Sequence, residues 1–161
     1  DINFDIGTRN ASLKELLSLL PSKFLPWLDN TKVEGKVGIL ASLKGRYQAE
    51  TQTFPNASFR FKIEQGKLQN KNANSAIEDL ELRFSAKMPA LNYDSLHAKL
   101  DTLSFHIDQD NFFAESNIKG YDTPIIYGKI DAVLDLAKTQ KALGVTTADL
   151  KGKLKMNLLP V

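Results

Sequence analysis

The side chains that could do acid–base or metal chemistry are few in this chain of 161 residues. His97 and His106 are its 2 histidines, and Asp101 and Asp108 are the carboxylates near them. A metal site or a general base needs several such groups converging on one point. Apolar alternation places His97 on a wet strand face and His106 between inward neighbours, with both aspartates beside turns. We therefore interpret the histidines as solvated or strand-edge residues.

Sequence motifs of catalysis are also missing. The chain has no GxSxG, HExxH, P-loop or GxGxxG pattern, and it has no cysteine. Gly35-Lys36 and Gly152-Lys153 lie within segments that alternate like strands, so they lack the context of a phosphate loop. Function must be argued from a site, so we expect no enzyme, no cofactor and no metal. A hydrolase is the third hypothesis, and it requires a converging nucleophile and base.

Aromatic and cationic residues alternate from Phe59 to Lys62, as they do on some surfaces that bind nucleic acid. In a strand, Phe59 and Phe61 point to one face, whereas Arg60 and Lys62 point to the other. The phenylalanines are therefore better explained as core residues. The formal net charge of +2 gives no broad attraction to a polyanion. We expect no nucleic-acid partner.

Composition is that of an ordinary globular chain, with 42% hydrophobic and 25% charged residues. Its length predicts a single domain over residues 1–161 that can bury a core. No stretch approaches the roughly 20 apolar residues of a membrane span. The chain begins at Asp1 without a signal peptide, and we interpret it as a fragment of a larger chain.

Period-two alternation predicts about eight strands, mostly in hairpin order. The final stretch is the clearest example, with a strand up to Leu136, a short helix over about residues 137–144, and a strand from Leu150 to Leu158. A change of parity after Leu100 predicts a bulge near residues 101–102, and Gln65-Gly66 predicts a second bulge or tight turn.

One helical segment near the start of the chain is expected to cover the sheet. Residues 12–15 form a capping box, and the leucines that follow have helical spacing. The prolines at 21 and 26 interrupt the helix, but the apolar stripe continues to about residue 29. We predict a helical lid over about residues 11–29, carried by Leu13, Leu16, Leu17, Leu20, Phe24, Trp27 and Leu28.

The two ends of the chain repeat one plan. Phe4-Asp5-Ile6 matches Leu134-Asp135-Leu136, each just before a helix. After the helix, residues 33–39 match residues 150–156 in the form apolar-charge-Gly-Lys-apolar. A strand, a helix and a returning strand thus occur twice, which indicates a repeating unit that continues beyond the fragment.

These elements predict a mainly β fold with a small α part. The sheet is expected to be long, twisted and mostly antiparallel. It can curl on itself and fill its own interior, or it can stay open as a groove or half-barrel beneath the helical lid. An open apolar groove on a globular chain is usually a binding site or a contact with more of the same protein.

Several segments together carry a resemblance that covers essentially the whole chain. They are residues 4–6, 12–21, 33–37, 59–70, 77–84, 126–138 and 150–154. These segments resemble the AsmA-like family of bacterial envelope proteins, which is related to the TamB group, and the similarity is strongest to versions from the Bacteroidota.

This resemblance implies repeated β units that form a hydrophobic groove across the periplasm, anchored to the inner membrane by an N-terminal helix that lies outside this fragment. It implies roles in outer-membrane assembly and lipid homeostasis. The expected partners are phospholipid or another acyl lipid, and neighbouring repeats of the same chain or envelope proteins. A dimer of the fragment is also expected to be possible.

The residues that the resemblance carries over are those whose parity points into the groove, where they would hold acyl chains without a polar site. Ordinary core packing explains the same residues equally well. In that alternative, a fully packed β domain acts as a periplasmic scaffold through its outer surface. The groove candidates are Val37, Ile39, Phe59, Phe61, Leu82, Phe84, Ile130, Leu134, Leu154 and Met156.

Overall fold

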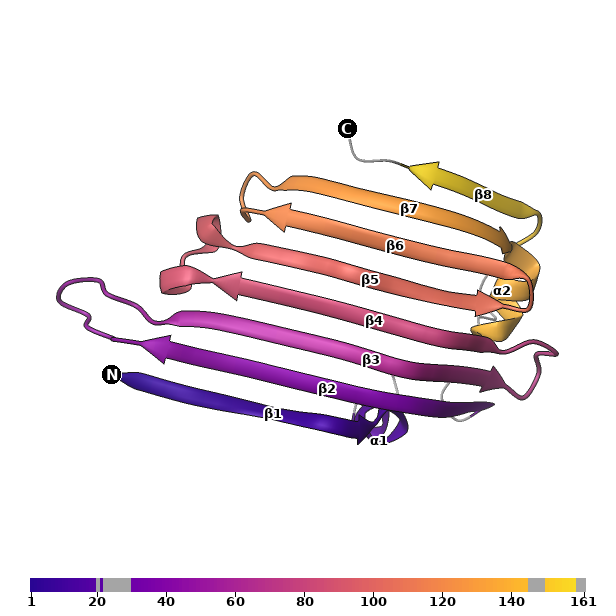
Figure 1. Ribbon diagram of the computed structural model, residues 1–161, viewed down its shortest axis with the longest axis horizontal. Helices are drawn as coiled ribbons and strands as arrows, with labels where there is room; N and C mark the ends of the chain where they lie inside the picture. Colours follow the sequence, from indigo (N-terminus) through magenta and orange to yellow (C-terminus); the bar gives the residue numbers. More distant parts are fainter. Residues whose placement is uncertain (20, 22–29, 145–149, 159–161) are drawn as a thin grey trace.

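The computed structural model describes residues 1–19, 21, 30–144 and 150–158. Its principal element is an 8-stranded antiparallel sheet in which each strand pairs with its neighbours in sequence (Figure 1). The sheet is not closed, and β1 and β8 are its two edges. The prediction of a mainly β, mostly antiparallel fold is confirmed. The strands are β1 Ile2–Ser12, β2 Thr31–Gly45, β3 Asn56–Asn70, β4 Ile77–Met88, β5 His97–Ile107, β6 Asp110–Lys119, β7 Ile125–Asp135 and β8 Lys153–Leu158.

The described helices are short. α1, Leu13–Ser18, follows β1, and α2, Leu136–Ala142, follows β7. Two 3-10 turns, η3 Pro89–Leu91 and η4 Tyr93–Ser95, connect β4 to β5. Within the described ranges, no helix has the length and apolar character needed to cross a membrane. The predicted lid residues Leu20, Phe24, Trp27 and Leu28 lie outside the described residues.

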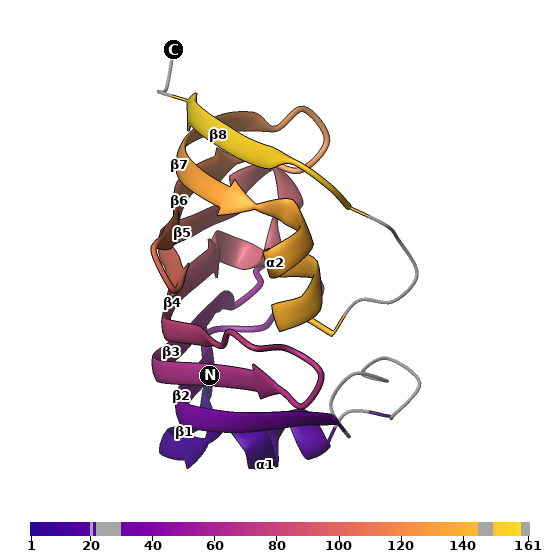
Figure 2. The same cartoon turned by 90° about the vertical axis from the view of Figure 1, so that its right-hand side faces the viewer.

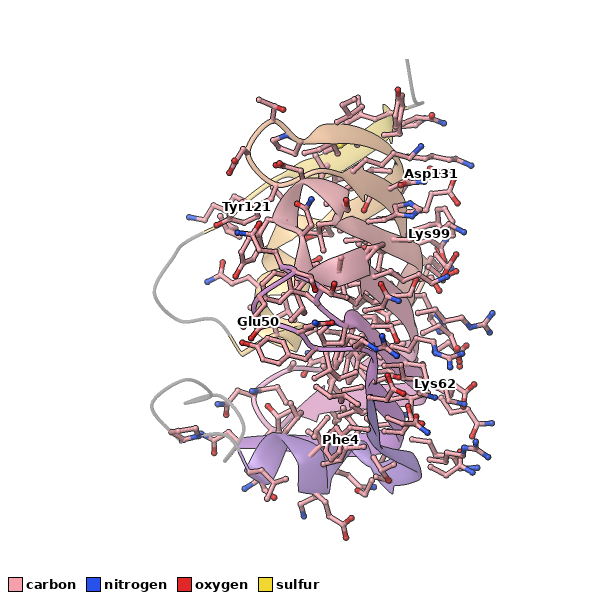
Figure 3. All side chains as sticks on the ribbon, turned by 90° about the vertical axis from the view of Figure 1, so that its left-hand side faces the viewer. Phe4, Glu50, Lys62, Lys99, Tyr121 and Asp131 are labelled. Atoms are coloured by element: carbon pink, nitrogen blue, oxygen red, sulfur yellow. The ribbon has the colours of Figure 1, made fainter. Side chains whose placement is uncertain are left out.

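The alternation in the sequence gives the sheet two different faces. Cross-strand pairing aligns apolar residues with apolar residues, for example Ile63 with Leu82 and Leu82 with Leu103. We call this side the apolar face. Lys62, Lys99 and Asp131 project from the opposite side of the sheet, which we call the polar face (Figure 3).

Among the described residues, the two buried apolar clusters lie towards the end of the sheet where α1 and α2 lie. Figure 1 shows both helices at that end. Leu13 of α1 packs with Val33, Val37 and Ile63, and Ala142 of α2 packs in a second cluster with Ile77 and Ile107. Both clusters use the apolar face, and Figure 2 shows α2 lying along that side. The helices thus cover one end of one face.

Both predicted bulges are present. The pairing of β5 with β6 shifts between Leu100 and Leu103, and the pairing of β3 with β4 shifts between Ile63 and Gly66. Gln65 takes a positive φ of 55° inside the second bulge. Because each bulge adds an unpaired residue, the apolar residues after it return to the same face.

The two ends of the sheet do repeat one strand–helix–strand plan. Ser12 pairs with Lys36, and Asp135 pairs with Lys153. Ser12 and Asp135 are also equivalent in role, because each accepts a hydrogen bond from the backbone N–H three residues later, in α1 and α2. Asp135 therefore corresponds to Ser12 and not to Asp5, so the sequence match of residues 4–6 to residues 134–136 is wrong.

The match of the returning strands is correct. Gly35 and Gly152 directly precede the paired lysines, and they share a positive φ, 129° and 102°. Residues other than glycine rarely adopt this backbone conformation, which explains why both units have glycine there. At Gly35 the neighbouring strand adds a second requirement, because a Cβ would lie 2.8 Å from the Cα of Gly66.

Gly35→Ala should lower the free energy of unfolding by about 1–3 kcal/mol, because alanine is strained at this φ and collides with backbone. Gly38→Ala, on the same strand, is the matched control: the atoms nearest its Cβ would belong to the flexible Lys62 side chain, and Gly38 lies outside the positive-φ region. It should cost less than about 0.5 kcal/mol. Urea unfolding of both variants checks this, and equal losses would contradict it.

Candidate functional site

The candidate site is the part of the apolar face that lies away from α1 and α2. Here the strands place aliphatic and aromatic residues in rows, with directly opposed Cβ atoms about 4.5–5.5 Å apart. Phe61 is the centre of one row, between Ile39 and Phe84. The next row, farther from α1 and α2, consists of Ala41, Phe59, Ala86, Ala98, Ile118 and Ile126.

The rows at this end are accessible to solvent. Phe59 is 38% exposed and Ile126 is 63% exposed, whereas Val37, beneath α1, is 1% exposed. Phe4 and Ile6 extend the exposed area onto β1, where they pair with Leu43 and Ala41. Contiguous apolar surface of this kind marks a site for a ligand or a partner.

Exposed aromatic pairs lie in the connections at the same end of the sheet. Tyr47 and Phe54 of the β2–β3 connection have ring centroids 5.8 Å apart, and Tyr93 and Tyr121 have centroids 5.6 Å apart. Glu50 and Tyr121, in these connections, lie on the side of the sheet opposite to Lys62 and Lys99 (Figure 3). Tyrosine suits a border between apolar surface and water, because its ring is apolar and its hydroxyl is polar.

Sequence reasoning missed these four aromatic residues, because it followed the strands and treated the connections as spacers. A signal was available. These connections all join strands at the same end of the antiparallel sheet. Aromatic residues within them must therefore gather at that end.

All the predicted groove residues do lie on the apolar face, but they lie in different surroundings. Val37 and Leu134 are buried, at 1% and 6% exposure, so they belong to the core. Phe59 is exposed, and its ring centroid lies 6.3 Å from that of Phe84. The half-buried members are Ile39, Phe61, Leu82, Phe84, Ile130, Leu154 and Met156.

The described lid residues pack on the core end. Leu13 is 3% exposed, and Leu16 and Leu17 pack against its cluster. Ala142 of α2 is 1% exposed and packs in the second cluster in the way that Leu13 packs in the first. Sequence reasoning missed Ala142, because a single alanine gives no apolar stripe.

The histidines take part in polar contacts between strands. His97 Nε2 lies 2.7 Å from the Asn117 amide oxygen. His106 lies 3.6 Å from a Glu78 carboxylate oxygen and 3.5 Å from that of Asp79. Lys67 donates a hydrogen bond to Glu78 and lowers its pKa. In the part of the chain that the structure describes, no group of His, Cys, Asp and Glu is placed to hold a metal ion.

A set of polar contacts attaches α2 to the turn after β5. Lys138 Nζ lies 3.3 Å from Asp108 and 3.6 Å from Asp110. Asp110 also accepts a hydrogen bond from the backbone N–H of Asp135. Hydrogen bonds from Ser75 and Lys138 lower the pKa of Asp108, and the hydrogen bond to Asp108 raises the pKa of Lys138.

The attachment of α2 should therefore depend on pH at both extremes. Because the pKa of Asp108 is lowered, its contribution is complete above the pKa of a free aspartate, about 3.9, and is lost as the pH falls through the lower folded value. The raised pKa of Lys138 has the opposite sign, so that contribution is lost only as the pH rises above about 10.4.

Amide NMR signals of residues 137–142 should shift in acid, as Asp108 is protonated and its hydrogen bond with Lys138 is lost. Asp108→Asn should speed hydrogen exchange in α2 at neutral pH, whereas Asp131→Asn, on the polar face, should not. Unchanged exchange in the Asp108 variant would contradict this role.

Comparison of the chain with family models, with curated proteins and with solved structures finds no match. The fold and the site define an open antiparallel β-sheet with one partly covered apolar face. The resemblance to the AsmA-like family stays a prediction.

Proposed function

We propose that this chain is a non-enzymatic, AsmA-like module that binds the acyl chains of phospholipid along the uncovered part of its apolar face. The observation that carries the proposal is the continuous cross-strand apolar row that includes exposed Phe59 and ends at exposed Ile126. Acyl chains need no directional partner, and their burial contributes about 0.8 kcal/mol per CH₂ group.

The arrangement of the site fits a molecule with an apolar tail and a polar head. In this proposal the twisted sheet is the floor of a groove, and α1 and α2 act as a lid at one end. The tail lies towards the helices, where residues such as Leu82 and Ile130 are half-buried. The head group stays in water at the other end, near the exposed Tyr93 and Tyr121.

The edges of the sheet support the proposed partners. β1 and β8 each carry backbone N–H and C=O groups that no described strand pairs on the outer side. Each edge strand also belongs to a copy of the strand–helix–strand unit. Unpaired edges favour strand addition, so we assign them to neighbouring repeats, to another envelope protein or to a second copy of the chain.

The proposed cellular setting follows from the resemblance. The module would lie in the periplasm of a Gram-negative bacterium, anchored to the inner membrane by a helix outside this chain. There it would contribute to outer-membrane assembly and lipid homeostasis by holding or conducting phospholipid.

The second candidate is a packed scaffold that acts through its polar face. The complete burial of Val37 and Leu134 favours it, because these predicted groove residues are core. The two functions differ in one property, which is whether the exposed apolar rows accept a ligand.

Ile126→Asp should remove bound phospholipid without unfolding the sheet, because it puts a carboxylate where acyl chains would lie. Val133→Asp is the matched control: it is on the same strand, β7, and is 44% exposed, but it lies on the polar face opposite Asn111. Native mass spectrometry of protein purified from its host, with lipid extraction, should show lipid on the wild type and the control.

A fluorescent fatty acid should likewise bind at least about tenfold more weakly to Ile126→Asp, a difference of about 1.4 kcal/mol. Circular dichroism should show both variants folded. If the wild type is free of lipid and binds no fatty acid, the acyl-chain proposal is wrong and the scaffold function is favoured.

A further inference from the structure

A hollow lined by several basic residues lies on the polar face, across strands β1 to β5. It has a volume of about 750 Å³, and its lining includes Arg9, Arg60, Lys62 and Arg83. We call it the arginine hollow. Gly7 and Gly38 also line it. The Lys62 side chain lies over Gly38, because a Cβ added at Gly38 would be 2.7 Å from it.

Strand register explains why the cations gather. The β1 bulge between Thr8 and Ala11 puts Arg9 and Asn10 opposite Gly38. Gly38 pairs with Lys62, and Lys62 pairs with Arg83.

Arg60 precedes Lys62 by two residues, so both side chains lie on the same face. Arg60 pairs with Ser85 of β4, which also lines the hollow. Lys62 and Arg83 are directly opposed, with Cβ atoms about 4.5–5.5 Å apart, and Arg60 is diagonal to Arg83 at about 7–8 Å. Arg9 lies on β1, two strands away from Lys62, and also lines the hollow.

Two carboxylates, Asp5 and Asp101, also line the hollow, and each is paired with a lysine. Asp5 lies 2.8 Å from Lys44, and Asp101 lies 2.5 Å from Lys99.

Lys62 is also paired, because it lies 2.7 Å from Glu64. Within the described ranges, no carboxylate lies within ion-pair distance, 4.0 Å, of Arg9, Arg60 or Arg83. Arg83 does help to lower the pKa of nearby Glu64. The hollow therefore gathers three guanidinium groups that make no direct ion pair with a described carboxylate, beside the lining residues Asp5 and Asp101.

Guanidinium groups recognise paired oxygens, because their N–H donors form a planar fork that matches phosphate or carboxylate. Asn10 and Ser85 add neutral side chains that can donate hydrogen bonds. Several forks lining one hollow favour a tetrahedral anion with several oxygens over a single carboxylate. We propose that the arginine hollow binds a phosphate group.

The hollow is independent of the proposed acyl-chain site, because it lies on the opposite face of the sheet. Ile126→Asp should leave phosphate binding unchanged, and loss of the arginines should leave fatty-acid binding unchanged. Failure of either proposal can thus be told from failure of the other.

The first test is an NMR titration of the arginine Nε–H signals with inorganic phosphate, at constant ionic strength made up with chloride. Arg9, Arg60 and Arg83 should show saturable shifts. The double variant Arg60→Gln/Arg83→Gln should bind at least about tenfold more weakly, because both forks are lost. Arg46→Gln is the matched control, since Arg46 lies outside the hollow and 3.5 Å from Asp1.

The second test identifies the source of the phosphate. Vesicles of phosphatidylcholine, with and without phosphatidic acid, are sedimented with the wild type and the double variant. Binding that needs both phosphatidic acid and the arginines assigns the site to a lipid head group. Saturable binding of free phosphate without vesicle binding assigns it to a soluble phosphate.

Either of those results supports the proposal. It is overturned if phosphate and chloride give the same shifts, if the shifts never saturate, or if Arg46→Gln weakens binding as much as the double variant. Thermal unfolding of both variants controls for folding. The substituted arginines are solvent-exposed, so the variants should unfold within a few degrees of the wild type.

Discussion

The structure depends on the burial of one face of a two-faced sheet by helices that are much shorter than its strands. α1 has 6 residues and α2 has 7, so they span roughly 9–11 Å at 1.5 Å per residue. β2 has 15 residues and spans roughly 50 Å. These helices can cover only one end of the apolar face. The buried clusters and the exposed rows both follow from this mismatch.

Sequence periodicity predicted the strands and their faces, because side-chain direction in a strand depends only on parity and on bulges. The shift after Leu100 and the Gln65-Gly66 bulge were both readable for that reason. Parity does not say where along a face a residue lies relative to a covering helix. Val37 and Phe59 have the same parity relation to the sheet, yet one is 1% exposed and the other 38%. To tell that Val37 belongs to the core and Phe59 to the candidate site, one must know where α1 packs on the sheet.

Short sequence matches were informative only where backbone geometry constrained them. The pattern apolar-Asp-apolar fits any alternating strand, and it misaligned Asp5 with Asp135. Gly35 and Gly152 were matched correctly, since both units require a positive φ before the paired lysine. The arginine hollow was not predictable at all. Arg9 is far from Arg60 and Arg83 in sequence, and only the register of a bulged edge strand brings it to the same hollow.

The order of the strands gives a reason why such a unit can be lengthened. Every strand pairs with its neighbours in sequence, so an added strand at β1 or β8 disturbs no interior pairing. An added strand–helix–strand unit would bring its own helix to the same end of the same face, as α1 and α2 already do. The covered end and the exposed apolar rows would then both grow across the strands. On the proposal of acyl-chain binding, one short local plan is thus sufficient to extend a continuous apolar path.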